Sequence, residues 1–514
     1  MSNFIAVLLK LYCLWVNFLH PIAGIFSSKF GREIDRYKQG VSSLILDTME
    51  LENGMSTALP DHIADNSNRK GTWVTASAHI ITAVIGSGVL SLSWAIAQLG
   101  WVAGPIVILL FSLVTWFTST LLADCCRDPV SGRRCSCYMD AVKSNLGGID
   151  SKFCGIAQYV NLVGTTIGYS ITSAISMVAI KRSGCFQRHG HDAGCHVKNN
   201  MFMIIFGIIE IILSQIPNFD ELSGLSVVAA VMSFAYASIG LGLSIAKVAE
   251  GTHARTSLTG TTTGVDVTSA QKIWNCFEAL GDIAFSYAFS VVLIEIQDTI
   301  KSSPPENEAM KKATSFGISV TTMFYMLCGV LGYAAFGNNA PGNFLTGFGF
   351  YDPYWLIDVA NLCIIVHLVG AYQVYCQPIF KRVEDWWFNR RPNNSFIKEG
   401  RPINLPLCGV YHFSAFRLVW RTAYVIMTTV MAMTLPFFND ILGVLGATAF
   451  WPLTVYFPIQ MHIAREKIQP YSWKWIWLNV LVVVCLVISL LAAAGSFAGI
   501  VKDLHTFKPF TSVS

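Results

Sequence analysis

Eleven long apolar stretches, each bordered by polar residues, constrain this chain of 514 residues more than any other feature. A helix needs about 20 apolar residues to cross a lipid bilayer, so stretches of this length suit crossing helices. They run at 72–99, 102–123, 153–180, 201–216, 222–246, 275–299, 313–335, 354–378, 416–435, 438–460 and 475–498. The pattern therefore predicts an all-α polytopic membrane protein with eleven spans and a transmembrane domain over 72–498.

The composition agrees with a membrane protein and excludes several other classes. Hydrophobic residues make up 53% of the chain and charged residues 13%, whereas roughly 25% of an ordinary soluble domain is charged. Lys and Arg (35) nearly balance Asp and Glu (31), which argues against a nucleic-acid-binding protein. The sequence contains no nucleophile elbow, metalloprotease helix or phosphate-binding loop, so we expect no enzyme activity and no metal.

The distribution of basic residues predicts the orientation in the membrane. If residues 1–71 are cytoplasmic, 26 Lys and Arg residues fall on the inner side and 9 on the outer side, and none falls in the interior of a span. This bias favours a cytoplasmic N-terminal region, and an odd number of spans then places the tail 499–514 outside. Residues 1–48 precede a second methionine, Met49, and we interpret them as an alternative-start extension or a twelfth span.

Cysteine usage supports the same orientation. Of 14 cysteines, only Cys185 and Cys195 lie in predicted outer loops, and both lie in the same loop. Paired thiols in an oxidising compartment usually form a disulfide, which is our prediction here. The alternative is a metal site that also uses His189, His191 and His196.

A small-residue motif interrupts the first span. Two glycines flank a serine in Gly86-Ser87-Gly88, and this arrangement weakens the helix and permits an unwound segment. The N–H groups at the start of the second half-helix would then bind a carboxylate. The alternative is a helix-packing motif, and the motif alone does not decide between the two.

Polar residues inside the third span form a stripe. Asn161, Thr165 and Tyr169 are four residues apart and share one helix face. We take the three as candidate binding residues that line a cavity; alternatively, they form hydrogen bonds to a neighbouring helix.

Three ionisable residues lie inside spans, where each needs a partner or a water-filled cavity. Asp282 lies one helical turn before Ser286, His79 lies about two turns before Gly86, and His367 lies near the middle of the eighth span. Histidine titrates near pH 6.5, which suits proton binding from an acidic exterior. We take the three as candidates for proton coupling; alternatively, the histidines only hydrogen-bond neighbouring helices.

From Arg69 onward the sequence resembles the plant amino acid permeases of the amino acid/auxin permease family. The resemblance covers about 440 residues. It is carried by RKGTWVTASAHIITAVIGSGVLSLSWAIAQLGW, VDVTSAQKIW, GDIAFSY, YAAFGNNAPGNFLT and further stretches in the same order. Long collinear matches of this kind are far more specific than a short motif.

The resemblance implies a proton-coupled amino acid symporter of broad specificity in the plasma membrane. The implied partners are the amino acid, the proton as coupling ion and the bilayer, without any other cofactor. The implied fold is LeuT-type: two inverted repeats of five spans and one additional helix. Spans one and six would each be broken near the middle of the membrane. The first break assigns substrate binding to Gly86, Ser87 and Gly88. The second assigns it to Ser286, Tyr287 and Phe289, although the sequence itself does not mark a break there. A non-transporting amino acid sensor is the alternative function, and a channel is a weaker third.

Overall fold

The computed structural model describes most of the chain from residue 69 to residue 506. The described residues are 69, 71–190, 192, 194–215, 223–251, 254–349, 354–391, 394, 396, 401–405 and 409–506. The predicted extension 1–48, nearly all of the N-terminal region 1–71 and residues 507–514 of the predicted tail lie outside them.

Helices make up most of the described structure, as the apolar pattern predicted. The longer helices are α4 (Trp73–Val84), α5 (Gly88–Asp124), α6 (Tyr138–Leu146), α7 (Gly148–His189), α8 (Asn199–Leu213), α9 (Ser223–Ala249), α10 (Ser269–Ser286), α12 (Glu306–Phe336), α13 (Tyr354–Arg390), α15 (Ala415–Thr434), α16 (Phe438–Ala449), α17 (Phe457–Arg465) and α18 (Trp473–Thr506). Short helical segments are η2 (Ser290–Val292), α11 (Leu293–Asp298), η3 (Gly337–Asn339), η4 (Phe344–Phe348) and the π-helical η5 (Phe450–Tyr456).

The chain divides into two compact units. The first combines residues 1–69 with 391–418, and the second combines 70–390 with 419–514. The described part of the first unit contains an antiparallel hairpin of β1 (Arg401–Leu405) and β2 (Gly409–Phe413), paired from Arg401–Phe413 to Leu405–Gly409. This hairpin lies between two of the apolar stretches, whose periodicity gives no information about a loop of this kind.

The helices of the second unit suit a bilayer. Eight helical segments of the described chain are long and apolar enough to cross it, and Trp73–Val84 and Asn199–Leu213 are shorter apolar helices. Large apolar side chains of α18, such as Val483 and Leu490, are 57% and 61% exposed, which is expected of surface that faces lipid. The chain is therefore a multi-pass membrane protein.

The expected boundary between the first two spans is a corner inside α5. Gly100 has a φ of +85°, and a Cβ there would overlap backbone atoms of residues 258–260. Only glycine combines this left-handed conformation with so close an approach of a loop, so the corner depends on the residue type.

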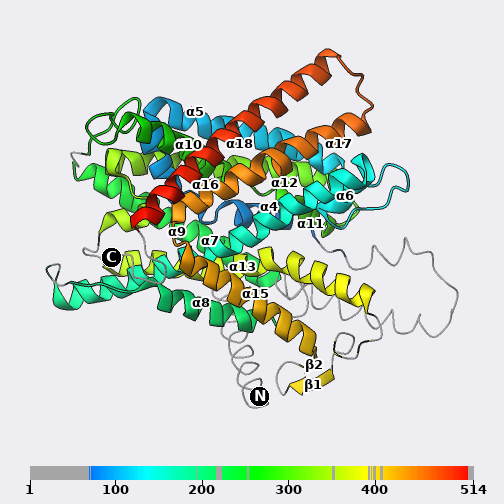
Figure 1. Cartoon of the computed structure of the whole chain (residues 1–514), viewed down its shortest axis with the longest axis horizontal. Helices are drawn as coiled ribbons and strands as arrows, with labels where there is room; N and C mark the ends of the chain where they lie inside the picture. Colours follow the sequence, from blue (N-terminus) through cyan, green and yellow to red (C-terminus); the bar gives the residue numbers. More distant parts are fainter. Residues whose placement is uncertain are drawn as a thin grey trace. The chain divides into compact units, whose positions relative to one another are not determined.

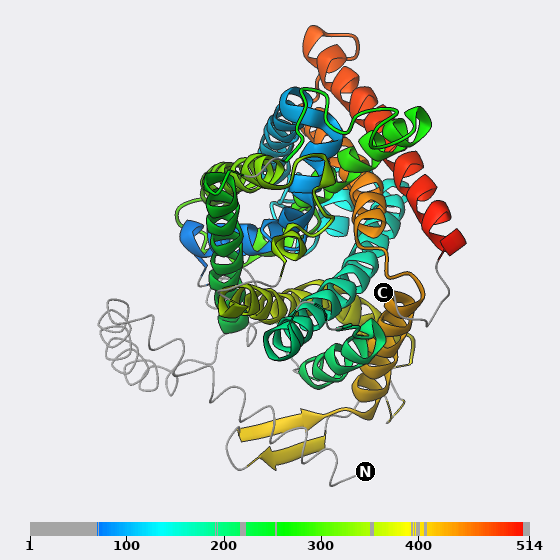
Figure 2. The ribbon, with the colours of Figure 1, turned by 90° about the vertical axis from the view of Figure 1, so that its left-hand side faces the viewer.

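Two groups of helices pack together within the second unit. α10, α16 and α18 pack against one another, and α13 packs against α7 and α9 (Figures 1 and 2). α5 contacts both α10 and α12, while α4 contacts α12 and α9.

One end of this unit is closed by paired groups. Gly71 pairs with the backbone of residues 299–301, and its N–H donates to the Thr299 carbonyl at 2.9 Å. Nearby, Glu306 accepts from Arg127 at 2.5 Å and from Arg134 at 2.8 Å. This hydrogen bond to Glu306 raises the pKa of Arg127 above its ordinary value. We refer to these residues as the paired end.

One basic residue does not lie where we expected it. The count of basic residues placed Arg421 on the inner side and outside the span interiors, although it falls within the apolar stretch 416–435. The structure places it inside α15, only 2% exposed. Its Nε donates to Glu384 at 2.7 Å and its Nη1 to the Ser214 carbonyl at 2.7 Å. A buried guanidinium is tolerated here because these partners satisfy it.

Candidate functional site

Two helices are interrupted inside the second unit. The first breaks between Val84, the last residue of α4, and Gly88, the first residue of α5, as the glycine motif permitted. The second breaks after Ser286, where α10 ends and three residues without α-helical pairing precede η2 and α11. Each break leaves helix-terminal N–H and C=O groups without partners in their own helix.

The two breaks touch each other. A Cβ at Gly88 would lie 2.6 Å from the Oγ and 2.9 Å from the Cα of Ser286, so only glycine fits at this contact. The Tyr325 hydroxyl joins both breaks, because it donates to the carbonyl of Ser286 at 3.0 Å and also contacts that of Val84. The Tyr236 hydroxyl donates to the Gly86 carbonyl at 2.9 Å.

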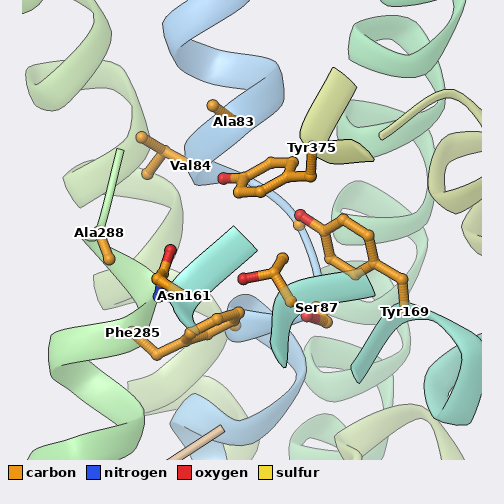
Figure 3. Close-up of a pocket in the computed structure, with 11 residues that line it drawn as sticks. Ala83, Val84, Ser87, Asn161, Tyr169, Phe285, Ala288 and Tyr375 are labelled. Atoms are coloured by element: carbon orange, nitrogen blue, oxygen red, sulfur yellow. The ribbon is translucent and has the colours of Figure 1, made fainter. Parts of the chain in front are cut away.

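A small closed cavity lies between the breaks and α7. Its free volume is about 10 Å³, which is room for roughly one water molecule. The lining residues are Ala83, Val84, Gly86, Ser87, Gly88, Asn161, Thr165, Tyr169, Phe285, Ala288 and Tyr375 (Figure 3). Any ligand larger than a water molecule would require these walls to separate.

Three side-chain groups that line this cavity have no hydrogen bond to the described part of the chain. Among the described residues, the Ser87 hydroxyl, the Asn161 amide nitrogen and the Thr165 hydroxyl are buried without a hydrogen bond. Figure 3 shows Ser87 and Asn161 among the residues that line this space. Buried polar groups are costly to leave unsatisfied, so an arrangement of this kind suits a polar ligand.

Six of the nine residues expected to bind substrate line the cavity, and three do not. Those that line it are Gly86, Ser87, Gly88, Asn161, Thr165 and Tyr169. Ser286 instead donates to the Asp282 carbonyl at 2.9 Å, and the Tyr287 hydroxyl donates to Thr322 at 3.1 Å. Phe289 is fully buried and is not among the lining residues.

Sequence analysis did not identify four aromatic residues of this region. Phe285 and Tyr375 line the cavity, and the ring of Tyr375 packs 5.5 Å from that of Tyr169. Tyr236 and Tyr325 hold the carbonyls of the breaks. Only the proximity of Phe285 to the expected break at Ser286 could have indicated any of them.

The three candidates for proton coupling occupy different surroundings. His367 is fully buried; a Cβ at Gly86 would lie 3.6 Å from its Nε2, which has no partner in the described structure. Its Nδ1 lies 2.8 Å from the Ser233 hydroxyl and 3.0 Å from the Ala229 carbonyl. Asp282 is also fully buried, and neither of its oxygens has a hydrogen bond to a described residue.

His79 is the exception, because it is only half-buried on α4 and does not line the cavity. No contact within the described parts of the chain joins His79, Asp282 and His367. The structure therefore places Asp282 and His367 beside the breaks and leaves His79 about two helical turns from Gly86 along α4.

The two cysteines of the predicted outer loop are bonded to each other. Cys185 and Cys195 form a disulfide with their Cα atoms 6.0 Å apart. Bonded sulfurs cannot ligate a metal, and the described residues contain no group of three metal-binding side chains. His191, part of the metal alternative, lies outside the described residues.

Comparison with known proteins identifies the family. Residues 69–502 match the family described as "Transmembrane amino acid transporter protein". The chain is 64% identical to amino acid permease 6 of Arabidopsis thaliana over 446 residues, covering 86% of this chain and 93% of the relative. It is 62% identical to amino acid permease 1 of the same plant over 447 residues, covering 87% and 92%.

A solved structure shows the same fold. The crystal structure of MhsT in complex with L-phenylalanine matches with a TM-score of 0.52 and 10% identity, covering 83% of this chain and all of that one. The likeness places the chain among LeuT-like folds. Together with the family match over residues 69–502, it leads to one conclusion: the chain belongs to the transmembrane amino acid transporter family, among the plant amino acid permeases.

Proposed function

We propose that this protein is a proton-coupled symporter that imports amino acids of broad specificity across the plasma membrane. The observation that carries the proposal is the small cavity, where the start of α5 meets three buried polar side chains without protein partners. The names of the relatives and of the family support the same substrate class.

The geometry suggests how an amino acid is oriented. The N–H groups at the start of α5, the positive end of that helix, receive the carboxylate together with Ser87 and Thr165. The carbonyl groups at the ends of α4 and α10 receive the ammonium group. Phe285 and Tyr375 form the wall that contacts the side chain of the substrate.

Proton coupling requires that protonation and substrate favour the same conformational change. His367 suits this role because its Nε2 faces Gly86, so a proton there would change the charge beside the substrate carboxylate. Asp282 suits it because Ser286, which contacts Gly88, is hydrogen-bonded to its backbone carbonyl. His79 acts along α4, farther from the cavity.

The proposal includes the membrane arrangement. Eleven crossings, formed as two inverted repeats of five and one additional helix, place the N-terminus in the cytoplasm and the C-terminus outside. The basic residues of the sequence support this orientation.

Uptake of a panel of labelled amino acids by a deficient host, at two external pH values and with or without a protonophore, tests the function. We expect concentrative uptake that rises at acidic pH and falls to equilibration when the proton gradient is collapsed. Uptake that never exceeds equilibration would indicate a channel. Normal surface expression without uptake of any amino acid would indicate the sensor instead.

A further inference from the structure

A second and larger cavity lies beside α10, α16 and α18. Its volume of about 630 Å³ falls in the range of pockets that hold small molecules. Residues from α5, α7, α10, α16, α18 and the loop around 342–346 line it, and it shares none of them with the small cavity between the breaks. We refer to it as the outer cavity, after its predicted side of the membrane.

Two buried carboxyl groups converge in the outer cavity. Glu278 of α10 is 7% exposed and Asp440 of α16 is 6% exposed. A Cβ at Gly499 of α18 would overlap Asp440 Oδ1 and lie 3.4 Å from Glu278 Oε2, so both oxygens surround one point. No ion pair found in the described chain includes either residue. Two acids arranged in this way are stabilised by a shared proton or by a cationic group between them.

Close packing of α18 against α10 creates this arrangement. A Cβ at Gly495 would lie 2.5 Å from the backbone nitrogen of Glu278. With glycine at positions 495 and 499, the backbone of α18 lies directly against α10. This close packing keeps the Glu278 carboxyl group next to the backbone of α18.

Hydrogen-bond donors line the same cavity, and the charge of Lys502 acts on both Glu278 and Asp440. Lys502 follows Gly499 by three residues and so lies on the same face of α18. Asn343 is 5% exposed; its Oδ1 accepts from the Leu345 N–H at 3.1 Å, while its Nδ2 has no partner among the residues described. A buried amide nitrogen without a partner points to a ligand that supplies an acceptor.

We propose that the outer cavity binds a second amino acid molecule, with its ammonium group between Glu278 and Asp440 and its carboxylate at Lys502 and Asn343. This inference rests on the proposed amino acid transport. Asp503 of α18 adds a third acidic residue to the lining, in which Lys502 is the basic residue. The cavity therefore favours amino acids with cationic or neutral side chains and disfavours those with anionic ones.

Equilibrium binding of labelled L-alanine to the purified full-length protein tests the second site directly. We expect two molecules per protein in the wild type and one in the Glu278→Gln/Asp440→Asn variant. Glu308→Gln, the same chemical change at an exposed position of α12, should retain two. One molecule per wild-type protein with normal uptake would overturn the second site and leave the proposed function standing. Neither binding nor uptake of any amino acid would overturn the proposed function itself.

Transport kinetics provide a second readout that does not depend on the amount of protein. In the double variant we expect the apparent KM for lysine to rise about tenfold, because the charge-assisted hydrogen bonds to its ammonium group are lost. The apparent KM for glutamate should rise less, because the two removed negative charges also repelled its side chain. In Lys502→Gln, an exposed position that tolerates substitution, the apparent KM should rise for both amino acids. Unchanged constants in both variants would contradict the proposal.

Discussion

The paired end and the outer cavity use charged residues in opposite ways. At the paired end, Glu306 binds both Arg127 and Arg134, and the backbone of Gly71 joins residues 299–301. In the outer cavity, Glu278 and Asp440 face each other without a basic partner among the described ion pairs.

This difference indicates which end is locked. A buried ion pair resists opening, because separating it leaves uncompensated charges in a poorly hydrated place. Unpaired acids beside a cavity of about 630 Å³ instead remain available to a ligand. The structure therefore has one closed end and one receptive end, with the two breaks between them.

The largest expected effect comes from separating the breaks. In Gly88→Ala the new methyl group would collide with Ser286, so we expect uptake to fall to the background of the host while the protein still reaches the surface. In Gly86→Ala the nearest atom is 3.6 Å away, and uptake should persist with weaker affinity. Gly184→Ala, where no atom lies within 4 Å, is the matched control. Normal affinity in Gly88→Ala would mean that the motif only packs helices.

Opening the paired end is the next test. Glu306→Gln leaves Arg134, whose side chain is only 5% exposed, without its charged partner. Loss of one partner from a buried pair costs about 3–5 kcal/mol, so the locked state should be destabilised. We expect faster hydrogen–deuterium exchange at residues 299–301 and reduced uptake. Glu308→Gln serves as the control, and equal exchange in both variants would show that Glu306 does not lock this end.

Asp282 lies on α10 between the outer cavity and the second break, one turn after Glu278 and one turn before Ser286. We expect Asp282→Asn to abolish substrate-evoked current or to remove its dependence on external pH, because the side chain can no longer release a proton. His367→Ala and His79→Ala should shift the pH dependence of substrate affinity, with the larger shift for His367, whose Nε2 faces the break. Wild-type pH curves in all three variants would place proton binding elsewhere.

We expect the smallest change in uptake from removing the Cys185–Cys195 disulfide, which also reports the side of the membrane that the receptive end faces. If α8 and α9 each cross once, the Cys185–Cys195 loop and the start of α10 lie on the same side. A membrane-impermeant thiol reagent should label these cysteines in intact cells only after reduction. Replacing both with serine should lower stability by about 2–4 kcal/mol with little loss of uptake. Labelling that requires permeabilised cells would reverse the orientation.

The two breaks differ in how far sequence could predict them. Gly86 and Gly88 weaken the first helix by their own lack of a side chain, so the position of that break could be read from the residues. Ser286, Tyr287 and Phe289 carry no comparable signal. There the interruption is stabilised by Tyr325, which is distant in the sequence. For this reason only the family resemblance predicted the second break.

The same contrast holds for the cavities. Periodicity on a single helix was enough to place Asn161, Thr165 and Tyr169 on one face, and all three line the small cavity. The outer cavity joins α10, α16 and α18, and the convergence of Glu278 with Asp440 depends on glycines about 220 residues later in the chain than Glu278. Sequence spacing carries no information about such a meeting.

The sequence by itself determined the membrane class, the position of most helices and the polar stripe, because each follows from hydrophobicity and short-range helical geometry. It also marked where the first helix could break, and the structure decided that it does. The tertiary structure alone decided the second break, the tyrosines that hold the open carbonyls, the hairpin, the π-helical segment Phe450–Tyr456 and the pairing of charges at one end. These features depend on which helices lie side by side, and that is settled by packing of the whole chain rather than by any one segment.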